Sequence, residues 1–423
     1  MTGMALLDHA LVSARPQALG ALLRYFRDLD RAEEAFQEAC LRALRTWPAN
    51  GPPRDPVAWL VMVGRNAGLD GVRRRARETD LPEEDRISDL GDAEADLAER
   101  LDGSHYRDDV LRLMFVCAHP DLPATQQIAL ALRIVSGLTV PQIARAFLVG
   151  ESAMEQRITR AKARVAAAGV PFEAPGPAER AERLGAVAAM LYLVFNEGYT
   201  TAATAGAAAG ALADEAIRLA RLLIRLFPAE PEIMGLCALM LLTRARTPAR
   251  LDADGVSIPL EAQDRSRWDR GLIAEGLALV DKAMRHRRPG PYQIQAAIAA
   301  LHARAPRFAD TDWAEIELLY GALERMQPSP VITLNRAVVV ARLRGPGPAL
   351  AIVDPLEPKL AGYAYFHGAR GAFLQQLGRA RDAREAFDRA ISLARSPAEA
   401  TEIRAHIDRL VEEASMPAAS TVS

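Results

Sequence analysis

Arginine and asparagine side chains gather in the stretch 55–77, DPVAWLVMVGRNAGLDGVRRRAR. Guanidinium groups bind phosphate oxygens, and the amide of an asparagine both donates to and accepts from the edge of a base. The side chains with this chemistry are Arg65, Asn66, Arg73, Arg74, Arg75 and Arg77, and the acidic Asp70 lies among them. This pattern predicts a surface that contacts nucleic acid; a solvated basic helix end is the alternative that the same residues allow.

A single helix would place these side chains on one face. Asp55 followed by Pro56 is typical of a helix start, because proline suits the first helical position. Apolar residues then recur at helical spacing and predict an inner face: Trp59, Leu60, Val63, Ala67 and Leu69. The segment before it, 48–56, is PANGPPRDP, and its prolines and glycine predict a loop and exclude helix.

A second basic stretch, 137–165, has the pattern of a helix-turn-helix. Thr139 with Gln142, and Ser152 with Glu155, have the spacing of capping boxes. We expect helices over 140–147 and about 151–167, joined by a tight turn. The second helix would expose a polar face able to enter a major groove and reach phosphates. That face comprises Glu155, Gln156, Arg157, Thr159, Arg160, Lys162 and Arg164, although many helical hairpins share the pattern.

Charge is distributed unevenly along the first 170 residues. The formal net charge of all 423 residues is −2. Residues 78–109 hold 13 acidic and 3 basic side chains, whereas the rest of 1–170 holds 19 basic and 11 acidic ones. Two basic blocks joined by an acidic connector are unusual for an enzyme and typical of a protein that contacts nucleic acid at two places. Few aromatic residues and many alanines, leucines and arginines favour an all-α fold.

The helix predicted over 30–47 has an apolar stripe of Ala32, Ala35, Phe36, Ala39, Cys40, Ala43 and Leu44. Its polar side chains are expected to face outward: Glu33, Glu34, Gln37, Glu38 and Arg42. Plain solvation explains such a face. The functional interpretation is a docking face for a basic helical partner.

Together these features resemble extracytoplasmic-function (ECF) sigma factors of bacterial RNA polymerase. Residues 10–77 look like sigma region two and 108–168 like sigma region four. The matching residues in the first block are Asp30 to Glu34, Gln37 to Ala39, Ala58 to Leu60, Arg65, Asn66, Asp70, Arg73 and Arg74. Those in the second block are Gly137 to Thr139, Ile143, Ala144 and Arg157 to Lys162. Glu155 departs from the family, in which many members carry a basic or small residue there.

The resemblance implies roles for three sets of residues. Glu33, Glu34, Gln37, Glu38 and Arg42 would bind the largest subunit of core polymerase. Arg65, Asn66, Asp70, Arg73, Arg74 and Arg75 would contact the minus-ten promoter element. Glu155, Gln156, Arg157, Thr159, Arg160 and Lys162 would contact the minus-thirty-five element. Melting of the minus-ten element is physically reasonable, because capture of a flipped base offsets an unstacking cost of a few kcal/mol.

The chain continues beyond such sigma factors, and residues 180–412 are helical by pattern. Gly371, Ala383, Phe387 and Ala390 lie at tetratricopeptide (TPR) offsets, and Ala337, Ala349 and Val353 follow the same offsets one repeat earlier. The parts before these fit poorly, which favours a short solenoid of degenerate hairpins. Loops are expected at 196–200, 244–254, 287–291, 327–330 and 344–348, with Gly198 ending a helix. Polar stretches that are unusual for repeat helices provide candidate regulatory residues: Asn196, Glu197, Tyr199, Asp264, Arg265, Arg267 and Trp268. The alternative is that these residues pair within the domain and have a structural role. They resemble the sigma-factor subgroup with a C-terminal TPR-like domain, which is thought to regulate the sigma factor.

We therefore expect an all-α chain with region two over 1–77, an acidic linker over 78–107, region four over 108–170, a linker over 171–179, a TPR-like regulatory domain over 180–412 and a tail over 413–423. No nucleophile–base pair, phosphate loop or metal spacing indicates an enzyme, a cofactor or a metal. No run is long enough to span a bilayer, no secretion signal opens the sequence, and the three cysteines indicate a reducing cytoplasm. Expected partners are core polymerase, promoter DNA and a ligand or protein at the C-terminal domain. The alternative is a helix-turn-helix regulator with a TPR-like scaffold.

Overall fold

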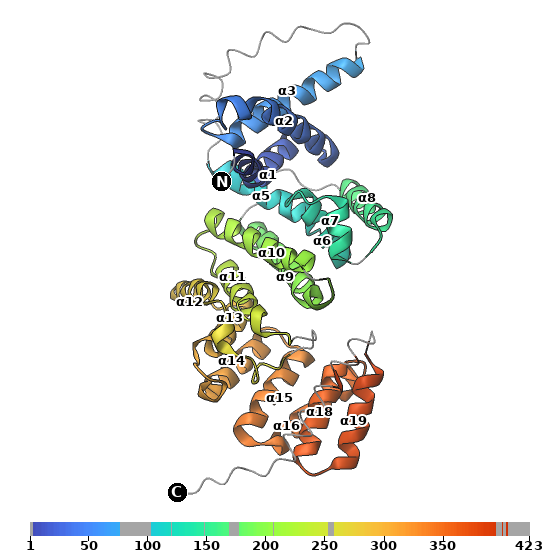
Figure 1. Cartoon of the computed structure of the whole chain (residues 1–423), viewed down its shortest axis with the longest axis vertical. Helices are drawn as coiled ribbons and strands as arrows, with labels where there is room; N and C mark the ends of the chain where they lie inside the picture. Colours follow the sequence, from blue (N-terminus) through green and yellow to red (C-terminus); the bar gives the residue numbers. More distant parts are fainter. Residues whose placement is uncertain are drawn as a thin grey trace. The chain divides into compact units, whose positions relative to one another are not determined.

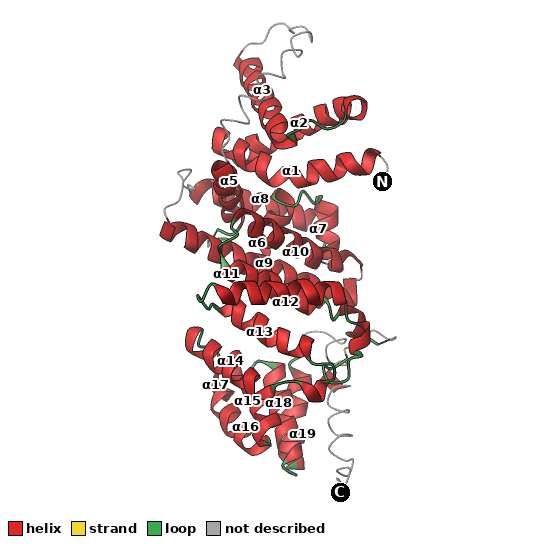
Figure 2. Ribbon diagram, turned by 90° about the vertical axis from the view of Figure 1, so that its left-hand side faces the viewer, coloured by secondary structure: helices red, strands yellow, loops and turns green. Residues whose placement is uncertain are grey.

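The structure is a computed structural model that describes residues 3–76, 103–168 apart from 120 and 148, 177–252 apart from 206, 258–394, 400 and 403–404. These described residues form helices and connecting loops without a β-strand (Figures 1 and 2). The all-α prediction is confirmed. The chain divides into two compact units, Met1–Phe227 and Pro228–Ser423.

The first unit begins with a three-helix bundle of α1 (Gly3–Phe26), α2 (Leu29–Asn50) and α3 (Pro56–Ala76), in which each helix packs against the other two. The apolar stripe predicted for α2 forms its inner face, since Ala32, Ala35, Phe36, Ala39 and Ala43 are buried. Leu44, which the pattern places in the same stripe, is 44% exposed. It lies at the edge of the buried face.

Helix α2 continues through Pro48 to Asn50, so the prediction of a loop from residue 48 was wrong. Proline in the last turn forfeits a single backbone hydrogen bond, and Trp47 just before it is buried against Trp59, with ring centroids 5.3 Å apart. The helix ends at Gly51, whose φ of 76° suits glycine, and the Gly51 N–H donates to the Trp47 carbonyl at 2.8 Å.

Four shorter helices follow: α5 (Gly103–Cys117), α6 (Ala124–Ile134), α7 (Val140–Ala146) and α8 (Glu151–Ala168). Thr139 and Gln142 form the predicted capping box at the start of α7. Helix α8 already includes Glu151, so Ser152 lies in its first turn and is not the cap. Met154, Ile158, Ala161 and Val165 are buried along α8, which packs against α6 and α7. The helix-turn-helix prediction is thus confirmed.

The first unit ends with a long hairpin of α9 (Pro177–Ala205) and α10 (Ala207–Leu226). The loop expected at 196–200 does not form, because α9 runs straight through it with Gly198 buried inside the helix. Packing of α9 along α10 and onto α5, α6 and α7 outweighs the roughly 1 kcal/mol that a glycine costs within a helix. This hairpin belongs to the first compact unit, whereas the sequence suggested a division near residue 180.

The second unit is a succession of helices in which neighbours along the chain pack together. They are α11 (Pro231–Arg244), α12 (Arg270–Arg285), α13 (Pro291–Arg304), α14 (Trp313–Met326), α15 (Pro330–Arg344), α16 (Pro346–Val353), α17 (Glu357–Leu360), α18 (Ala364–Gln376) and α19 (Ala380–Ser392). Residues of α15, α16, α18 and α19 share one hydrophobic core. A smaller cluster joins α13, α14 and α15.

The repeat-like positions of the last hairpin are interior. A Cβ on Gly371 would lie 2.4 Å from the Phe387 ring, and Ala383 and Ala390 are fully buried. The expected result of Gly371→Ala is therefore a destabilisation of about 1–3 kcal/mol from overpacking, measured by chemical denaturation followed by circular dichroism. Gly368→Ala in the same helix is the control, since its added methyl group meets open space and should be neutral or stabilising.

Candidate functional site

Helix α3 presents the predicted asparagine and arginine on its outer side. The Asp55 carboxylate accepts from the Val57 and Ala58 N–H groups, both at 3.0 Å, and so fixes the start of the helix. Asn66 is exposed, and the half-buried Arg65 rests its guanidinium over the Tyr25 ring, 4.3 Å from the centroid. The side chains of Asp70, Arg73, Arg74 and Arg75 lie outside the described residues.

The predicted polar face of α2 is only partly exposed. Glu34 and Gln37 are exposed, and Glu38 pairs with Arg42 of the next turn at 3.3 Å. Glu33 does not face outward as expected, because it is 5% exposed and surrounded by cations. Its carboxylate lies within ion-pair distance of Arg15, Arg133 and Lys162.

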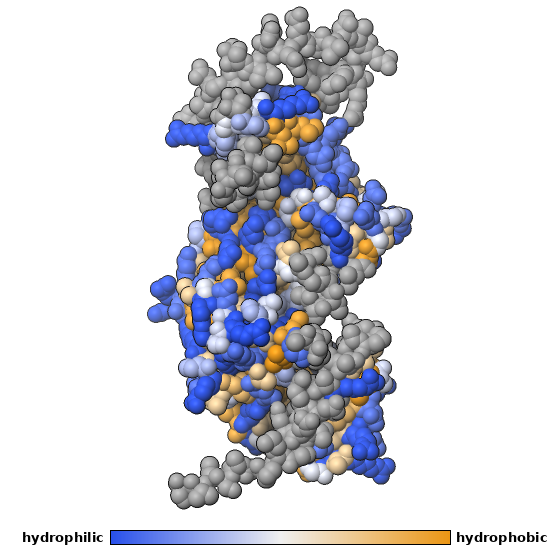
Figure 3. Space-filling model, in the orientation of Figure 1, coloured by the Kyte–Doolittle hydropathy of each residue, from blue (hydrophilic) through white to orange (hydrophobic). Residues whose placement is uncertain are grey.

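Helix α8 carries an open, shallow depression on its first turns. The depression is lined by Ser152, Glu155, Gln156, Thr159 and Arg160, so four of the six predicted minus-thirty-five residues lie together on one face. Arg157 is half-buried on the same helix. In the view of Figure 3 polar residues dominate the surface over α8. Such a face offers hydrogen-bond donors and acceptors to base edges and an arginine to a phosphate.

The sixth residue of that set, Lys162, is turned toward the α1–α2–α3 bundle instead. Its ammonium lies 2.7 Å from Asp30 Oδ1 and 2.7 Å from Glu33 Oε2. Burial works against the charge of Lys162, but the hydrogen bonds to both carboxylates outweigh it and raise the pKa of the ammonium. Lys162 is thus charged and engaged within the chain.

Sequence reasoning missed Arg15, Asp30 and Arg133 as members of this network. Asp30 lies in the stretch of α2 that resembles sigma factors, but the residues around it do not predict its contact with Lys162, which lies 132 positions later. Arg15 and Arg133 occur in helices whose patterns indicate only amphipathicity. The spacing of α2 gave no signal for these partners either, because it assigns Glu33 to the polar face, and a buried carboxylate that needs a cationic partner is recognised only once the fold is known.

The candidate regulatory residues fall into two groups in different compact units. Asn196, Glu197 and Tyr199 are half-buried within α9, where the Tyr199 ring stacks on Phe195 at 5.6 Å. Asp264 and Arg267 are exposed around the short helix η3 (Arg265–Arg267) of the second unit. Asp264 caps it by accepting from the Ser266 hydroxyl and N–H, and these hydrogen bonds lower the pKa of Asp264.

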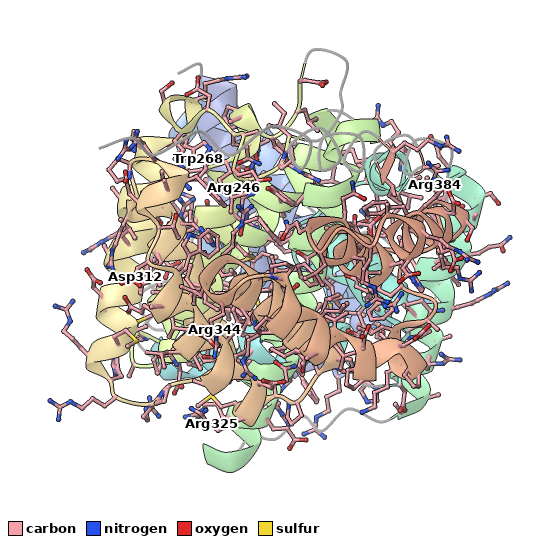
Figure 4. All side chains as sticks on the ribbon, turned by 90° about the horizontal axis from the view of Figure 1, so that it is seen from below. Arg246, Trp268, Asp312, Arg325, Arg344 and Arg384 are labelled. Carbon is pink, nitrogen blue, oxygen red and sulfur yellow. The ribbon has the colours of Figure 1, made fainter. Side chains whose placement is uncertain are left out.

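Arg265 and Trp268, two further members of that set, are interior rather than surface residues. Arg265 donates to the Ala305 carbonyl at 2.7 Å and to the His302 carbonyl, and its guanidinium lies 4.7 Å from the centroid of the buried Trp268 ring. Arg246 approaches the same ring (Figure 4). Burial and the charges of Arg246 and Arg265 lower the pKa of His302 to about 4, so its ring is neutral at pH 7. The contacts of Arg265 and Trp268 therefore favour the alternative interpretation, in which these two residues pair within the domain, over a regulatory role.

Other chemistry is scarce in the described part of the chain. Cys117 and Cys237 are buried and form no disulfide, and burial raises the pKa of the half-buried Cys40 to about 11. Among the residues that the structure places, no cluster of His, Cys, Asp and Glu has the arrangement of a metal site. None of the described helices combines the length and hydrophobicity needed to cross a bilayer.

The fold and these surfaces define a helical protein with a helix-turn-helix and a separate asparagine- and arginine-bearing helix bundle. Comparison with known protein families assigns these parts of the chain to family models. Residues 11–78 match the model of sigma-70 region 2, residues 112–165 match sigma-70 region 4, and residues 183–284 match a family of unknown function (DUF6596). An uncharacterized protein of Rhizobium meliloti (strain 1021) is 68% identical over 413 residues, which cover 98% of each chain.

The chain belongs to the sigma-70 family, with regions 2 and 4 followed by a C-terminal helical extension. It is a sigma factor, a class that binds core RNA polymerase and promoter DNA in transcription initiation and is not a class of enzymes. The family of unknown function spans the end of the first compact unit and the start of the second, since it includes most of α9, all of α10 and α11, and most of α12.

Proposed function

We propose that this chain is an ECF-type sigma factor whose C-terminal helices regulate it within the same polypeptide. The observation that carries the proposal is the order of its parts: a region 2 bundle, an acidic connector and a region 4 helix-turn-helix, directly followed by a hairpin that packs on region 4. As a partner of core polymerase it would act in the cytoplasm. Under this proposal Glu34, Gln37, Glu38 and Arg42 bind core, and Arg65, Asn66, Asp70, Arg73, Arg74 and Arg75 contact the minus-ten element.

The α9–α10 hairpin supports regulation in cis. Arg183 of α9 is buried with its guanidinium 5.1 Å from the centroid of the Phe115 ring of α5, and α9 also packs on α6 and α7. The hairpin therefore contacts the helices that support α8, while Glu155, Gln156, Thr159 and Arg160 remain exposed. A change in the position of α9 would be transmitted to the recognition helix through α6 and α7, without covering its DNA-facing side. The rest of the extension, TPR-like in its last hairpin, would bind the ligand or protein that biases this arrangement.

The exposed face of α8 gives the test of promoter recognition. We expect Arg157→Ala or Arg160→Ala to weaken promoter binding of the holoenzyme, because each removes a donor from the face that would enter the major groove. A lost base contact costs about 1–3 kcal/mol and changes the preference at one position, whereas a lost phosphate contact mainly reduces the salt dependence. The measurement is enrichment of promoter fragments from a genomic library by holoenzymes that contain each variant.

Arg381→Ala, which removes an exposed arginine from α19, is the control and should leave enrichment unchanged. Unaltered affinity and unaltered preference in both α8 variants would mean that another surface reads the upstream element. A helix-turn-helix repressor, the alternative function, would bind these fragments without core polymerase.

A further inference from the structure

Region 2 and region 4 are joined by a direct ionic contact between their two functional helices. Lys162, on the recognition helix α8, places its ammonium 2.7 Å from a carboxylate oxygen of Asp30 and 2.7 Å from one of Glu33. Both acids belong to α2, the helix with the candidate polymerase-binding face. Lys162 and Glu33, which were expected to contact DNA and core polymerase respectively, thus bind each other.

Glu33 is the centre of this contact. Besides Lys162, its carboxylate has Arg133 of α6 at 3.5 Å and Arg15 of α1 at 3.8 Å. Arg15 also donates to the carbonyl oxygens of Ile134 at 2.9 Å and Arg133 at 3.2 Å, at the end of α6. With Glu33 only 5% exposed, these charges are largely shielded from water, which makes their interaction stronger than that of surface pairs.

A second set of contacts holds the same two regions together. Helix α1 packs on α5 so closely that a Cβ on Gly20 would lie 2.7 Å from the Asp109 carbonyl oxygen. The buried Asp109 carboxylate binds Arg112 of its own helix at 2.7 Å and lies 3.4 Å from Arg24 of α1. The Lys162 contact is therefore the edge of an interface between regions.

This arrangement is incompatible with binding to both promoter elements. Elements centred ten and thirty-five base pairs upstream of a start site are about 25 base pairs apart, roughly 85 Å along B-DNA at 3.4 Å per base pair. Helices joined by a 2.7 Å contact do not span that distance. The connecting segment 77–102 has a maximum reach of about 90 Å at roughly 3.5 Å per residue, so its length permits separation.

We propose that Asp30 and Glu33 form an acidic docking surface on α2, which Lys162 of the recognition helix occupies in the free protein and from which core polymerase or promoter DNA must displace it. The two carboxylates take the place that a DNA phosphate would occupy beside Lys162. The contact itself rests on the structure, and only its consequence for transcription rests on the proposed function. Holding region 4 against region 2 would keep the free sigma factor from occupying promoter DNA.

The test measures proximity in the full chain without polymerase or DNA, so it is independent of sigma activity. Donor and acceptor dyes are attached at the exposed positions Arg45 of α2 and Ala167 of α8, each replaced by cysteine in a Cys40→Ala background. Energy transfer should be high in the wild type and should fall in Lys162→Glu, because the introduced carboxylate is repelled by Glu33. Adding Asp30→Lys should restore part of the transfer, since an opposite pair is formed again.

Arg160→Glu is the matched control, because it reverses a charge at an exposed position of the same helix. It should leave transfer at the wild-type level, and circular dichroism should show that all variants keep their helices. Equal transfer in the wild type, Lys162→Glu and Arg160→Glu would overturn the proposed docking contact. Addition of core polymerase should abolish transfer in the wild type, and persistence of high transfer in a core-bound chain would overturn the claim that the contact must open.

Discussion

Reversing the charges of Glu34 and Glu38 together is expected to reduce the affinity for core polymerase by at least roughly a hundredfold. Both side chains lie on the solvent side of α2, opposite its buried alanines and Phe36. Close charge pairs at interfaces contribute about 1.5–7 kcal/mol, and a lysine in place of each acid replaces attraction by repulsion. The loss of the exposed Glu38–Arg42 pair costs the fold little. The measurement is binding of the Glu34→Lys, Glu38→Lys chain to immobilised core enzyme, with circular dichroism alongside.

The control for this result carries the same change in net charge elsewhere. Glu182→Lys with Asp214→Lys alters exposed positions of α9 and α10, outside region 2, and should retain core binding. If the α2 variant loses its helical signal together with its affinity, these residues are structural. If it keeps both, core polymerase binds a different face.

Truncation is expected to destabilise the first compact unit when the chain ends after Ala168 and to leave it intact when the chain ends after Phe227. Ending the chain after Ala168 removes α9 and α10, and so exposes the faces of α5, α6 and α7 on which α9 packs. The Phe115 ring also loses the Arg183 guanidinium that covers it. The resulting loss should be on the order of 5 kcal/mol, comparable to the whole stability of a small domain. Ending it after Phe227 keeps the first compact unit intact, and residues 1–227 should unfold cooperatively. Thermal unfolding followed by circular dichroism compares the two.

The longer truncation then isolates the regulatory contribution of the second unit. If that unit acts in cis, transcription by residues 1–227 differs from transcription by the full chain. A fragment 1–168 that is as stable as 1–227 would contradict the role assigned to the hairpin. Equal transcription by 1–227 and the full chain would leave the second unit as an independent binding module.

The local patterns of the sequence predicted the elements of region 2 and region 4 well. Asp55–Pro56 does begin α3, and the Thr139–Gln142 box does begin α7, because capping and apolar spacing are decided by residues within one turn. In the last hairpin, the glycine-against-phenylalanine contact of Gly371 and Phe387 follows from repeat offsets. Such features depend on near neighbours in the sequence.

Errors arose where distant segments decide the environment of a residue. Glu33 lies on the polar side of α2, yet Arg133 and Lys162, a hundred or more positions away, bury it. Gly198 has the local pattern of a helix end, but packing against α10 carries α9 past it. Arg265 and Trp268 have the composition of a binding surface and instead hold η3 against the loop after α13. Sequence periodicity assigns a side chain to a face and does not identify what covers that face.

Transcription from promoter DNA by purified core polymerase shows whether the chain acts as a sigma factor. Core enzyme is incubated with a pool of genomic promoter fragments, with and without the full chain, and the run-off transcripts are compared. We expect a defined set of transcripts that requires the chain and disappears with the Glu34→Lys, Glu38→Lys variant, while the Glu182→Lys, Asp214→Lys control retains it. Transcripts that are the same in the presence and absence of the chain across the whole pool would contradict its role as a sigma factor.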